Sequence, residues 1–347
     1  MSTVGQGFSD DPSGQHATSM VTVVVCAYTE ARWRQTRTAV ESVLVQSPAP
    51  RQVILVVDHN QSLAERARRE LCSITVLESE GPPGLSGARN TGLRNAKQPV
   101  TVFLDDDAEA RPGWLASLVE PYHDPDVVAT GGSVHPRWPD RRPRWLPATF
   151  DWVVGCSYRG LPDAVGVVRN PIGANMSLRT EEALATGGFN TGVGRVGSHP
   201  RGCEETELAI RLTTSRPGSV VCYVPDAAVD HHVPPERLAA GYFLRRCWHE
   251  GQSKADIVEL GGASDGLSSE RRHVAAVIPA AIMQDVRAVI SGETAAVARI
   301  VVAIGGLAVT VAGYLTLRFR LAFRPPLSRL AKLRSKNGST VERSTSR

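Results

Sequence analysis

Three consecutive carboxylates, Asp105, Asp106 and Asp107, follow the short apolar run VTVFL in this chain of 347 residues. A run that is apolar on both faces is typical of a central strand in a parallel sheet. Adjacent carboxylates repel one another, so the cluster is unfavourable unless a cation or hydrogen-bond donors lie against it. The pattern predicts a cation site at the carboxyl end of this strand, where open α/β sheets bind ligands. The structural alternative is an acidic turn before the helix that begins near Pro112.

Other groups that could bind ligands or move protons follow predicted strands or begin helices. Asp58 ends a second apolar run, VILVV, where it either joins the Asp cluster or caps the next helix. Glu204 and Glu205 precede a helical segment, and they are either bases or complements to the helix dipole. His231 and His232 follow a late strand and are either metal ligands or incidental loop residues.

The first hundred residues alternate between strand and helix patterns. MVTVVVCAY, QVILVVDHN and SITVLESE predict strands, whereas residues 32–46 and 63–71 predict helices. The glycine-opened segment GLSGARNTGLRNAK predicts a further helix before the strand that ends at Asp105. This alternation predicts a parallel sheet with helices on both faces. All carboxyl ends of such a sheet lie along one edge, so Asp58 and the Asp cluster should face the same crevice.

Composition narrows the class of protein. A net charge of +4 gives no general nucleic-acid-binding character, and 42% hydrophobic residues allow one core with an appendage. The six cysteines form no C-x-x-C pair, which indicates reduced thiols in the cytosol and not a disulfide framework or zinc site. Residues 1–19 are rich in Ser, Gly and Asp, lack a signal-peptide pattern, and predict a disordered tail.

The C-terminal third predicts a membrane-associated helical appendage. Residues 239–294 have helical patterns, and residues 295–317 form a hydrophobic segment that has no charge from 300 onwards. Eighteen uncharged residues meet the lower length limit for a transmembrane helix, although a buried core helix is the alternative. The basic tail, 318–347, favours the cytoplasmic leaflet. A single span would separate this tail from a cytosolic domain, so either residues 274–290 complete a hairpin or the segment lies in the interface.

Seven blocks, in order, resemble glycosyltransferase family 2. They are VTVVVCAYTE, VILVVDHNQS, GLSGARNTGL, VTVFLDDDAE, GANMSLR with GGFN, GCEETELAIRL and VPDAAVDHHVPPERL. Together they cover roughly residues 21–238. The resemblance implies an inverting enzyme with the GT-A fold over residues 20–238, which is a Rossmann-like α/β fold with a mostly parallel sheet. The arrangement also resembles the bacterial subgroup that carries an apolar C-terminal segment.

The resemblance also implies roles for individual residues. Asp58 would contact the nucleoside base, and Asp105 and Asp107 are the outer residues of the D-x-D motif at the ribose and a divalent cation, Mn²⁺ or Mg²⁺. His231 would complete the metal shell. Glu205 would be the catalytic base, with Glu204 as the neighbouring alternative. The other residues assigned to the nucleotide-sugar site are Ala27, Glu30, Arg89, Asn90, Asp106 and Asn175. Two departures from the family pattern are His59, where an acid is common, and a Glu base where many members have Asp.

The sequence therefore predicts transfer of a sugar from a nucleotide-diphosphate sugar to a hydroxyl of a glycan or lipid-linked acceptor. The expected location is the cytoplasmic membrane, with the catalytic domain facing the cytosol. A nucleotidyltransferase is the first alternative, but CAYTEARW replaces the Gly- and Lys/Arg-rich phosphate loop that such an enzyme needs after its first strand. The second alternative is a non-catalytic membrane adaptor with a degenerate fold.

Overall fold

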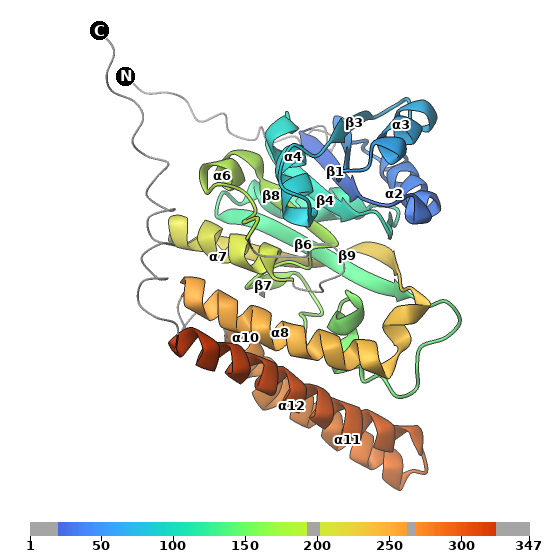
Figure 1. Cartoon of the computed structure of the whole chain (residues 1–347), viewed down its shortest axis with the longest axis vertical. Coiled ribbons are helices and arrows are strands. Elements are labelled where there is room, and N and C mark those ends of the chain that lie inside the picture. Colours follow the sequence, from blue (N-terminus) through green and yellow to red (C-terminus); the bar gives the residue numbers. More distant parts are fainter. Residues whose placement is uncertain (1–19, 193–201, 262–267, 324–347) are drawn as a thin grey trace.

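A computed structural model describes residues 20–192, 202–261 and 268–323 of the chain (Figure 1). The predicted tail 1–19 and residues 324–347 of the predicted basic tail lie outside the described residues. The fold class is the predicted one: an α/β sheet covered by helices on both faces, followed by long C-terminal helices.

The N-terminal part of the sheet is parallel, as the alternating pattern predicts. Its strands lie side by side in the order β3-β2-β1-β4, and all their carboxyl ends meet at one edge. The elements are β1 (Val21–Ala27), η1 (Glu30–Arg32), α2 (Trp33–Leu44), β2 (Gln52–Val57), α3 (Gln61–Glu70), β3 (Thr75–Glu78), α4 (Leu85–Asn95) and β4 (Val100–Asp105).

Beyond β4 the sheet becomes mixed, which differs from the mostly parallel sheet expected. Strand β8 pairs antiparallel with both β4 and β6, β9 runs parallel to β6, and β5 and β7 pair antiparallel with β9. Strand β5, which follows the Asp cluster, pairs with β9 at the far end of the sheet, and the neighbour of β4 is β8, which comes much later in the chain. The elements are β5 (Ala108–Ala110), α5 (Trp114–Val119), η2 (Glu120–His123), β6 (Val127–Arg137), η3 (Ala148–Val154), β7 (Gly166–Val168), β8 (Asn175–Arg179), α6 (Thr180–Ala185), α7 (Glu204–Ser215), β9 (Val220–His232) and η4 (Pro235–Leu238).

Alternating side chains of the strands build two cores, one on each face of the sheet. Val23 and Val25 of β1 pack with residues of α2, α3 and α5, whereas Val24 packs with residues of α4, α6 and α7. Burial of both faces explains why these strands read as nearly continuous apolar runs.

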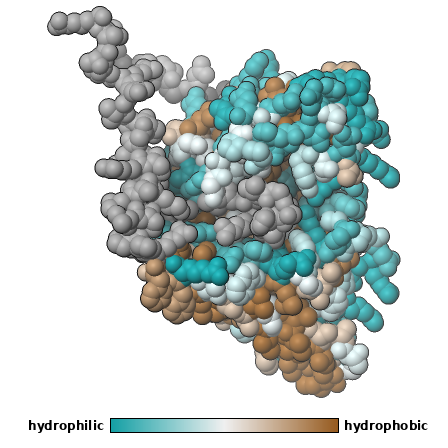
Figure 2. Space-filling view, in the orientation of Figure 1, coloured by the Kyte–Doolittle hydropathy of each residue, from teal (hydrophilic) through white to brown (hydrophobic). Residues whose placement is uncertain are grey.

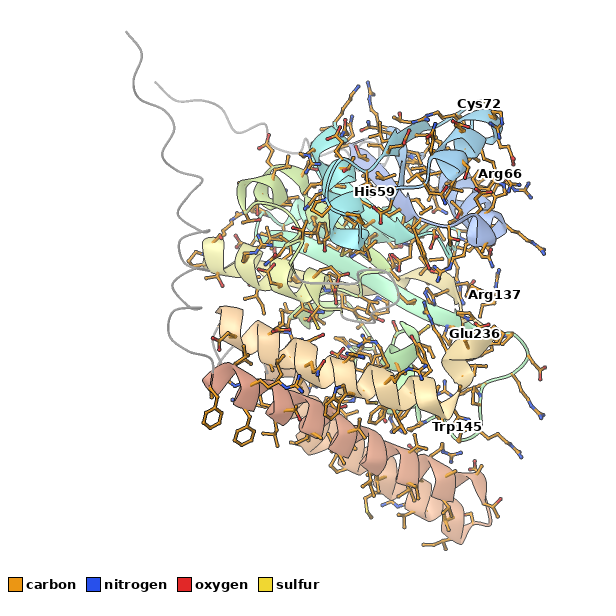
Figure 3. The ribbon with its side chains drawn as sticks, in the orientation of Figure 1. His59, Arg66, Cys72, Arg137, Trp145 and Glu236 are labelled. Carbon is orange, nitrogen blue, oxygen red and sulfur yellow. The ribbon has the colours of Figure 1, made fainter. Side chains whose placement is uncertain are left out.

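The C-terminal helices form a third layer next to the sheet domain. They are α8 (Ala240–Gly261), α10 (Ser268–Arg272), a π-helical turn η5 (His273–Val277), α11 (Ile278–Ile290) and α12 (Ala295–Ala322). A third apolar cluster joins them to η3, and its buried members include Phe150, Phe243, Ile278 and Ala303. Trp145, labelled near this layer in Figure 3, packs edge-on against Phe243 with ring centroids 5.8 Å apart.

Glycines allow α8 and α12 to approach closely. A Cβ on Gly313 would collide with the backbone of Trp248, and a Cβ on Gly251 would collide with the backbone of Thr310. Farther along the same interface, Arg318 of α12 forms an ion pair with Glu259 of α8 at 3.2 Å. Helix α12 therefore lies along α8 over most of its length.

The opposite side of this layer is apolar and exposed (Figure 2). Two helical segments, Glu270–Ile290 and Ala295–Ala322, are long and apolar enough to cross a membrane, with 6% and 17% of their apolar windows buried. We call this exposed apolar side the hairpin face. Its large residues are Met283, Val286, Ile290, Val297, Val301, Ile304, Leu315, Phe319 and Phe323.

Substitution of glycines in α12 tests this interface. We expect Gly313→Ala to lower the free energy of unfolding by about 1–3 kcal/mol, because the added methyl group overpacks the contact with α8. Gly305→Ala is the matched control on the same helix, since a Cβ there has no neighbour within 4 Å. Thermal unfolding of the detergent-solubilised protein measures both. Equal melting temperatures for the two variants would contradict the packing described here.

Candidate functional site

Strand pairing brings His231 to the Asp cluster. Strand β5 begins one residue after Asp107 and pairs with β9, so that Ala108 lies opposite His231. The amide of His232 donates to the carbonyl of Asp107 at 2.8 Å. As a result, Nε2 of His231 lies 3.2 Å from Oδ1 of Asp107. One ligand atom each from Asp105, Asp107 and His231 lie within 4.8 Å of one another.

Asp107 and His231 stabilise each other's charged forms. Burial favours neutral Asp107, but the charge and hydrogen bond of His231, together with Arg32, hold the pKa of Asp107 well below its usual range. Burial likewise favours neutral His231, but Asp107 raises the pKa of His231 to about 10. A histidine that binds a metal ion is neutral, so cation binding here would release the imidazolium proton.

Arg32 is a site residue that the sequence reasoning missed. Its Nη1 lies 3.0 Å from Oδ1 of Asp106 and 3.0 Å from Oδ2 of Asp107, so it offsets part of their repulsion. Burial and the charge of Asp107 nevertheless raise the pKa of Asp106 to about 7. Oδ2 of Asp106 is buried without a hydrogen-bond partner among the described residues. The sequence feature that could have indicated Arg32 is a basic residue soon after the first strand, in CAYTEAR.

These residues fit a divalent cation. Two carboxylates and one imidazole offer the mixed oxygen and nitrogen ligands that suit Mn²⁺ or Mg²⁺. A buried carboxylate cluster that Arg32 compensates only in part provides the negative charge that such an ion needs.

Arg89 joins the Asp cluster to the glutamate pair. It is almost completely buried at the inner face of α4, where Gly92 allows the helix to pack tightly on Val24 of β1. Its Nη1 donates to Oε1 of Glu204 at 2.9 Å, and its Nη2 donates to Oδ1 of Asp105 at 3.2 Å. A third bond goes to the carbonyl of Gly173 at 2.8 Å. Arg89 is therefore an internal positioning residue, not a surface arginine.

The two glutamates have different surroundings. Glu204 is buried and bonded to Arg89, and its Oε2 has no partner among the described residues. Glu205 is half-buried and lines a cavity. Burial and the negative charge of Glu204 raise the pKa of Glu205 to about 7. A carboxylate with that pKa and access to the cavity is suited to accept a proton near neutral pH.

Three predicted residues before the Asp cluster lie at the same sheet edge but, like Asp106 and Asp107, do not line this cavity. Asp58 accepts hydrogen bonds from the amide of Gly84 and from Nδ1 of His59, each at 2.8 Å (Figure 3 labels His59). The carbonyl of Ala27 accepts the amide of Asp58 at 2.7 Å. Glu30 is exposed and accepts a hydrogen bond from Ser62.

Two predicted amide residues instead make internal contacts. The side chain of Asn90 bonds both the amide and the carbonyl of Phe189, at 2.7 Å each. Asn175 is completely buried and joins β8 to three other segments. Its Oδ1 accepts from Trp114, and its Nδ2 donates to the carbonyls of Ser133 and Ala227. In this arrangement the side-chain amides of both residues form hydrogen bonds inside the protein.

Residues of the candidate site line one cavity of about 1170 Å³. Asp105, Arg89, Glu204, Glu205 and His231 line one part of it. Arg169, which follows β7, and residues from η3, α8, α10, η5, α11 and α12 line the rest. The residues of these helices include Trp152, Arg246, Glu250, Lys254, Glu270, Ile278, Leu307, Val311 and Tyr314. The sequence reasoning assigned none of this second group to the site, because nothing in the local pattern places the C-terminal helices against the sheet.

Removal of one carboxylate tests the cation site. We expect Asp107→Asn to weaken Mn²⁺ binding strongly, because the variant loses a charged ligand. Mutation of a residue that only supports a ligand typically lowers metal affinity about 10–100-fold, and the loss here should be larger. Isothermal titration calorimetry with Mn²⁺ alone measures the affinity. Asp230→Asn is the control, since Asp230 precedes His231 but pairs with Arg111 at the surface. Wild-type Mn²⁺ affinity in Asp107→Asn would show that the ion binds elsewhere.

Known proteins share both sequence and fold with this chain. Residues 22–181 match the profile of glycosyl transferase family 2. A glucosyl-dolichyl phosphate glucuronosyltransferase from Haloferax volcanii is 35% identical over 238 residues, which are 67% of this chain and 76% of that protein. Polypeptide N-acetylgalactosaminyltransferase 15 from Mus musculus is 34% identical over 116 residues, 30% of this chain and 18% of that protein.

Among solved structures, the mannosyltransferase PcManGT from Pyrobaculum calidifontis, in complex with GDP-Man and Mn²⁺, has a similar fold. Its TM-score is 0.55 at 20% identity, and the match covers 86% of this chain and 87% of that one. The sequence match to the archaeal relative extends over most of both proteins, and the family profile covers the strands that carry the Asp cluster. The chain belongs to glycosyl transferase family 2.

Proposed function

We propose that the protein transfers a sugar, with inversion, from a nucleotide-diphosphate sugar to a hydroxyl of a lipid-linked or cell-envelope glycan. Family membership favours this function over the nucleotidyltransferase and adaptor alternatives. The observation that carries the proposal is the single cavity in which Asp105 and His231 lie with Glu205, while Arg89 ties the two groups together. A cation-binding group and a base therefore face one reaction space.

On the donor side, Asp105, Asp107 and His231 would hold Mn²⁺ or Mg²⁺. The ion supplies positive charge for the diphosphate leaving group. Asp58, at the neighbouring strand end, remains the candidate for contact with the nucleoside. Arg89 keeps Asp105 oriented toward the cavity through its bond to Oδ1.

On the acceptor side, Glu205 would accept the proton of the attacking hydroxyl. Glu204 is the poorer candidate, because Arg89 occupies one of its oxygens and the residue is buried. General-base assistance of this kind contributes about 10²–10⁴-fold to rate. A single displacement with the base on the acceptor side inverts the anomeric centre.

Two observations support a lipid-linked acceptor. The archaeal relative is named for a reaction on glucosyl-dolichyl phosphate. In this chain, the two apolar helices that could associate with a membrane also line the cavity that contains Glu205. An acceptor held in a membrane would therefore reach the base from the side of α11 and α12.

The contacts of α12 favour attachment in the plane of the membrane over a transmembrane hairpin. Helix α8 lies along α12 and carries Arg246, Glu250, Lys254 and Glu259. If α12 crossed the bilayer, these ion pairs would enter the hydrocarbon region, where a single Arg, Lys or Asp already costs about 2.5–3.5 kcal/mol. We therefore propose that the hairpin face lies in the cytosolic interface and that the sheet domain stays in the cytosol.

Substitution of the glutamates tests the assignment of the base. We expect Glu205→Gln to retain donor binding and to lose about 10²–10⁴-fold in kcat for transfer, because the amide cannot accept the proton. Product formation from the donor, with Mn²⁺ present, measures transfer, and nucleotide-diphosphate titration measures binding. If Glu205→Gln transfers sugar at the wild-type rate and Glu204→Gln does not, the base is Glu204.

The same variants have a pH signature. The base must be ionised, so kcat/KM of the wild type should fall as the pH decreases through about 7, the raised pKa of Glu205. The apparent value belongs to the Glu204–Glu205 pair, which also faces Arg89 and Lys254. This acidic limb should be missing from the residual activity of Glu205→Gln.

Labelling of the hairpin turn tests the membrane arrangement. We expect a cysteine introduced by Ser291→Cys, between α11 and α12, to react with a membrane-impermeant maleimide in sealed vesicles whose cytosolic face is outward. The background variant is Cys72→Ser, which removes the exposed native thiol. Val45→Cys, at an exposed position on the sheet domain, is the positive control. Labelling of Ser291→Cys only after permeabilisation would demonstrate a spanning hairpin.

A further inference from the structure

A network of partly buried charges lies in the cavity between the sheet domain and the C-terminal helices. Lys254 lies 3.0 Å from Glu250 and 2.9 Å from Glu270. Arg246 pairs with Glu250 at 2.8 Å, and Arg169 makes a two-pronged contact with Glu270. All five side chains line the cavity. We call these residues the cavity charge network.

The network carries a surplus of positive charge. Burial favours the neutral acids, but Lys254 and the arginines lower the pKa values of Glu250 and Glu270 to about 2. Burial would also lower the pKa of Lys254, but its neighbours raise it well above its usual value. All five groups are therefore ionised at neutral pH, with three cations against two carboxylates. Glu205, which also faces Lys254, offsets part of this surplus when it is ionised. A partly desolvated surplus charge is unfavourable unless an anion lies near it.

Arg246 has donors available for such an anion. Among the described residues, the one hydrogen bond from its guanidinium goes to Oε2 of Glu250, whereas the group carries five N–H donors. The guanidinium carbon lies 5.5 Å from the ring centroid of Trp152, which helps to fix its position at the cavity wall. Planar guanidinium groups recognise phosphate oxygens in a two-pronged manner.

The network lies between the glutamate pair and an apolar wall. It contacts the start of α7 through Cys203, whose sulfur is 3.7 Å from Nζ of Lys254 and 3.9 Å from Oε1 of Glu250. On its other side, Gly251 packs against Thr310 of α12. Beyond that contact the cavity is lined by apolar residues of α11 and α12, among them Ile278, Leu307 and Val311.

We propose that Arg246, supported by Lys254 and Arg169, binds the phosphate of an acceptor in which the phosphate is joined directly to a hydrocarbon chain. The saccharide of this acceptor would extend toward Glu205, and the hydrocarbon chain would follow the apolar wall toward the hairpin face. The proposal rests on the proposed glycosyltransferase function and names the chemical class of its acceptor.

The donor diphosphate would bind at a different part of the site from the acceptor phosphate. The predicted cation ligands contact the glutamate pair through Arg89 and Glu204, whereas the cavity charge network contacts α7 through Cys203 and Lys254. The donor and the acceptor phosphate therefore approach the base from separate groups of residues. This arrangement suits a direct displacement, in which donor and acceptor lie on opposite sides of the reacting carbon.

The experiment uses farnesyl phosphate as the probe, with farnesol and inorganic phosphate as its two halves. Isothermal titration calorimetry of the full-length protein in detergent measures binding of each. We expect farnesyl phosphate to bind at least about tenfold more tightly than either half, because both the anion and the chain are recognised. Inorganic phosphate that binds as tightly as farnesyl phosphate would overturn the lipid assignment.

Two neighbouring arginines provide a matched pair of variants. Arg246→Gln should weaken farnesyl phosphate binding about tenfold or more and leave farnesol binding unchanged, and Arg246→Lys should restore part of the affinity. Glu250 keeps Lys254 as a partner in these variants, which favours retention of the fold. Arg245→Gln removes the same charge from an exposed position outside the cavity and should bind like the wild type. Equal farnesyl phosphate affinities for Arg246→Gln and Arg245→Gln would refute the phosphate site.

Transfer assays separate this proposal from the proposed function. With a glycosyl prenyl phosphate as acceptor, Arg246→Gln should raise KM, while the KM of the matching alkyl glycoside without phosphate should stay within about twofold. A purely structural ion network predicts equal losses for both acceptors and would contradict the proposal. If the wild type binds farnesyl phosphate through Arg246 but transfers no sugar, the proposed function fails and the phosphate site stands.

Discussion

The guanidinium of Arg89 is buried between Asp105 and Glu204, and the arrangement of the site depends on it. Each carboxylate belongs to a different part of the fold, one at the end of β4 and the other at the start of α7. Removal of the shared cation would leave the buried carboxylate of Glu204 without its hydrogen-bond partner and Asp105 without a compensating charge, which is unfavourable. One side chain therefore joins the end of β4, which carries the proposed cation ligand Asp105, to the start of α7, where the proposed base Glu205 follows Glu204.

The alternation of strand and helix predicted the parallel half of the fold, because β1 to β4 are buried on both faces and their apolar runs are distinctive. The antiparallel half could not be predicted in the same way. Strand β5 has three residues, and its pairing with β9 is a contact between distant parts of the chain. That pairing brings His231 to Asp107. The resemblance to the family motif predicted that His231 lies near the Asp cluster, whereas the local sequence pattern could not.

The candidate site was predicted in part for the same reason. Acidic residues at a strand end or a helix start are visible in the sequence, as Asp105, Asp107 and Glu205 show. Contacts that depend on packing are not visible in the sequence. It does not show that Arg32 offsets the charge of two aspartates, or that the side chain of Asn175 forms internal hydrogen bonds. The wall built by α8 and α12 was missed because glycine-mediated helix contacts have no local signature beyond the glycines themselves.

The close packing of α12 on α8 has a consequence for how such proteins can diverge. In many membrane-attached enzymes the anchor is a separate module that can be exchanged or deleted without altering the catalytic unit. Here α12, the proposed anchor, contributes residues such as Leu307 and Val311 to the cavity that contains Glu205. Changes in α12 that tune lipid affinity would also reshape the space for the acceptor, so the two properties are expected to evolve together. For protein engineering, polar replacement of the outward residues would preserve that space, whereas a shortened chain would open it to solvent.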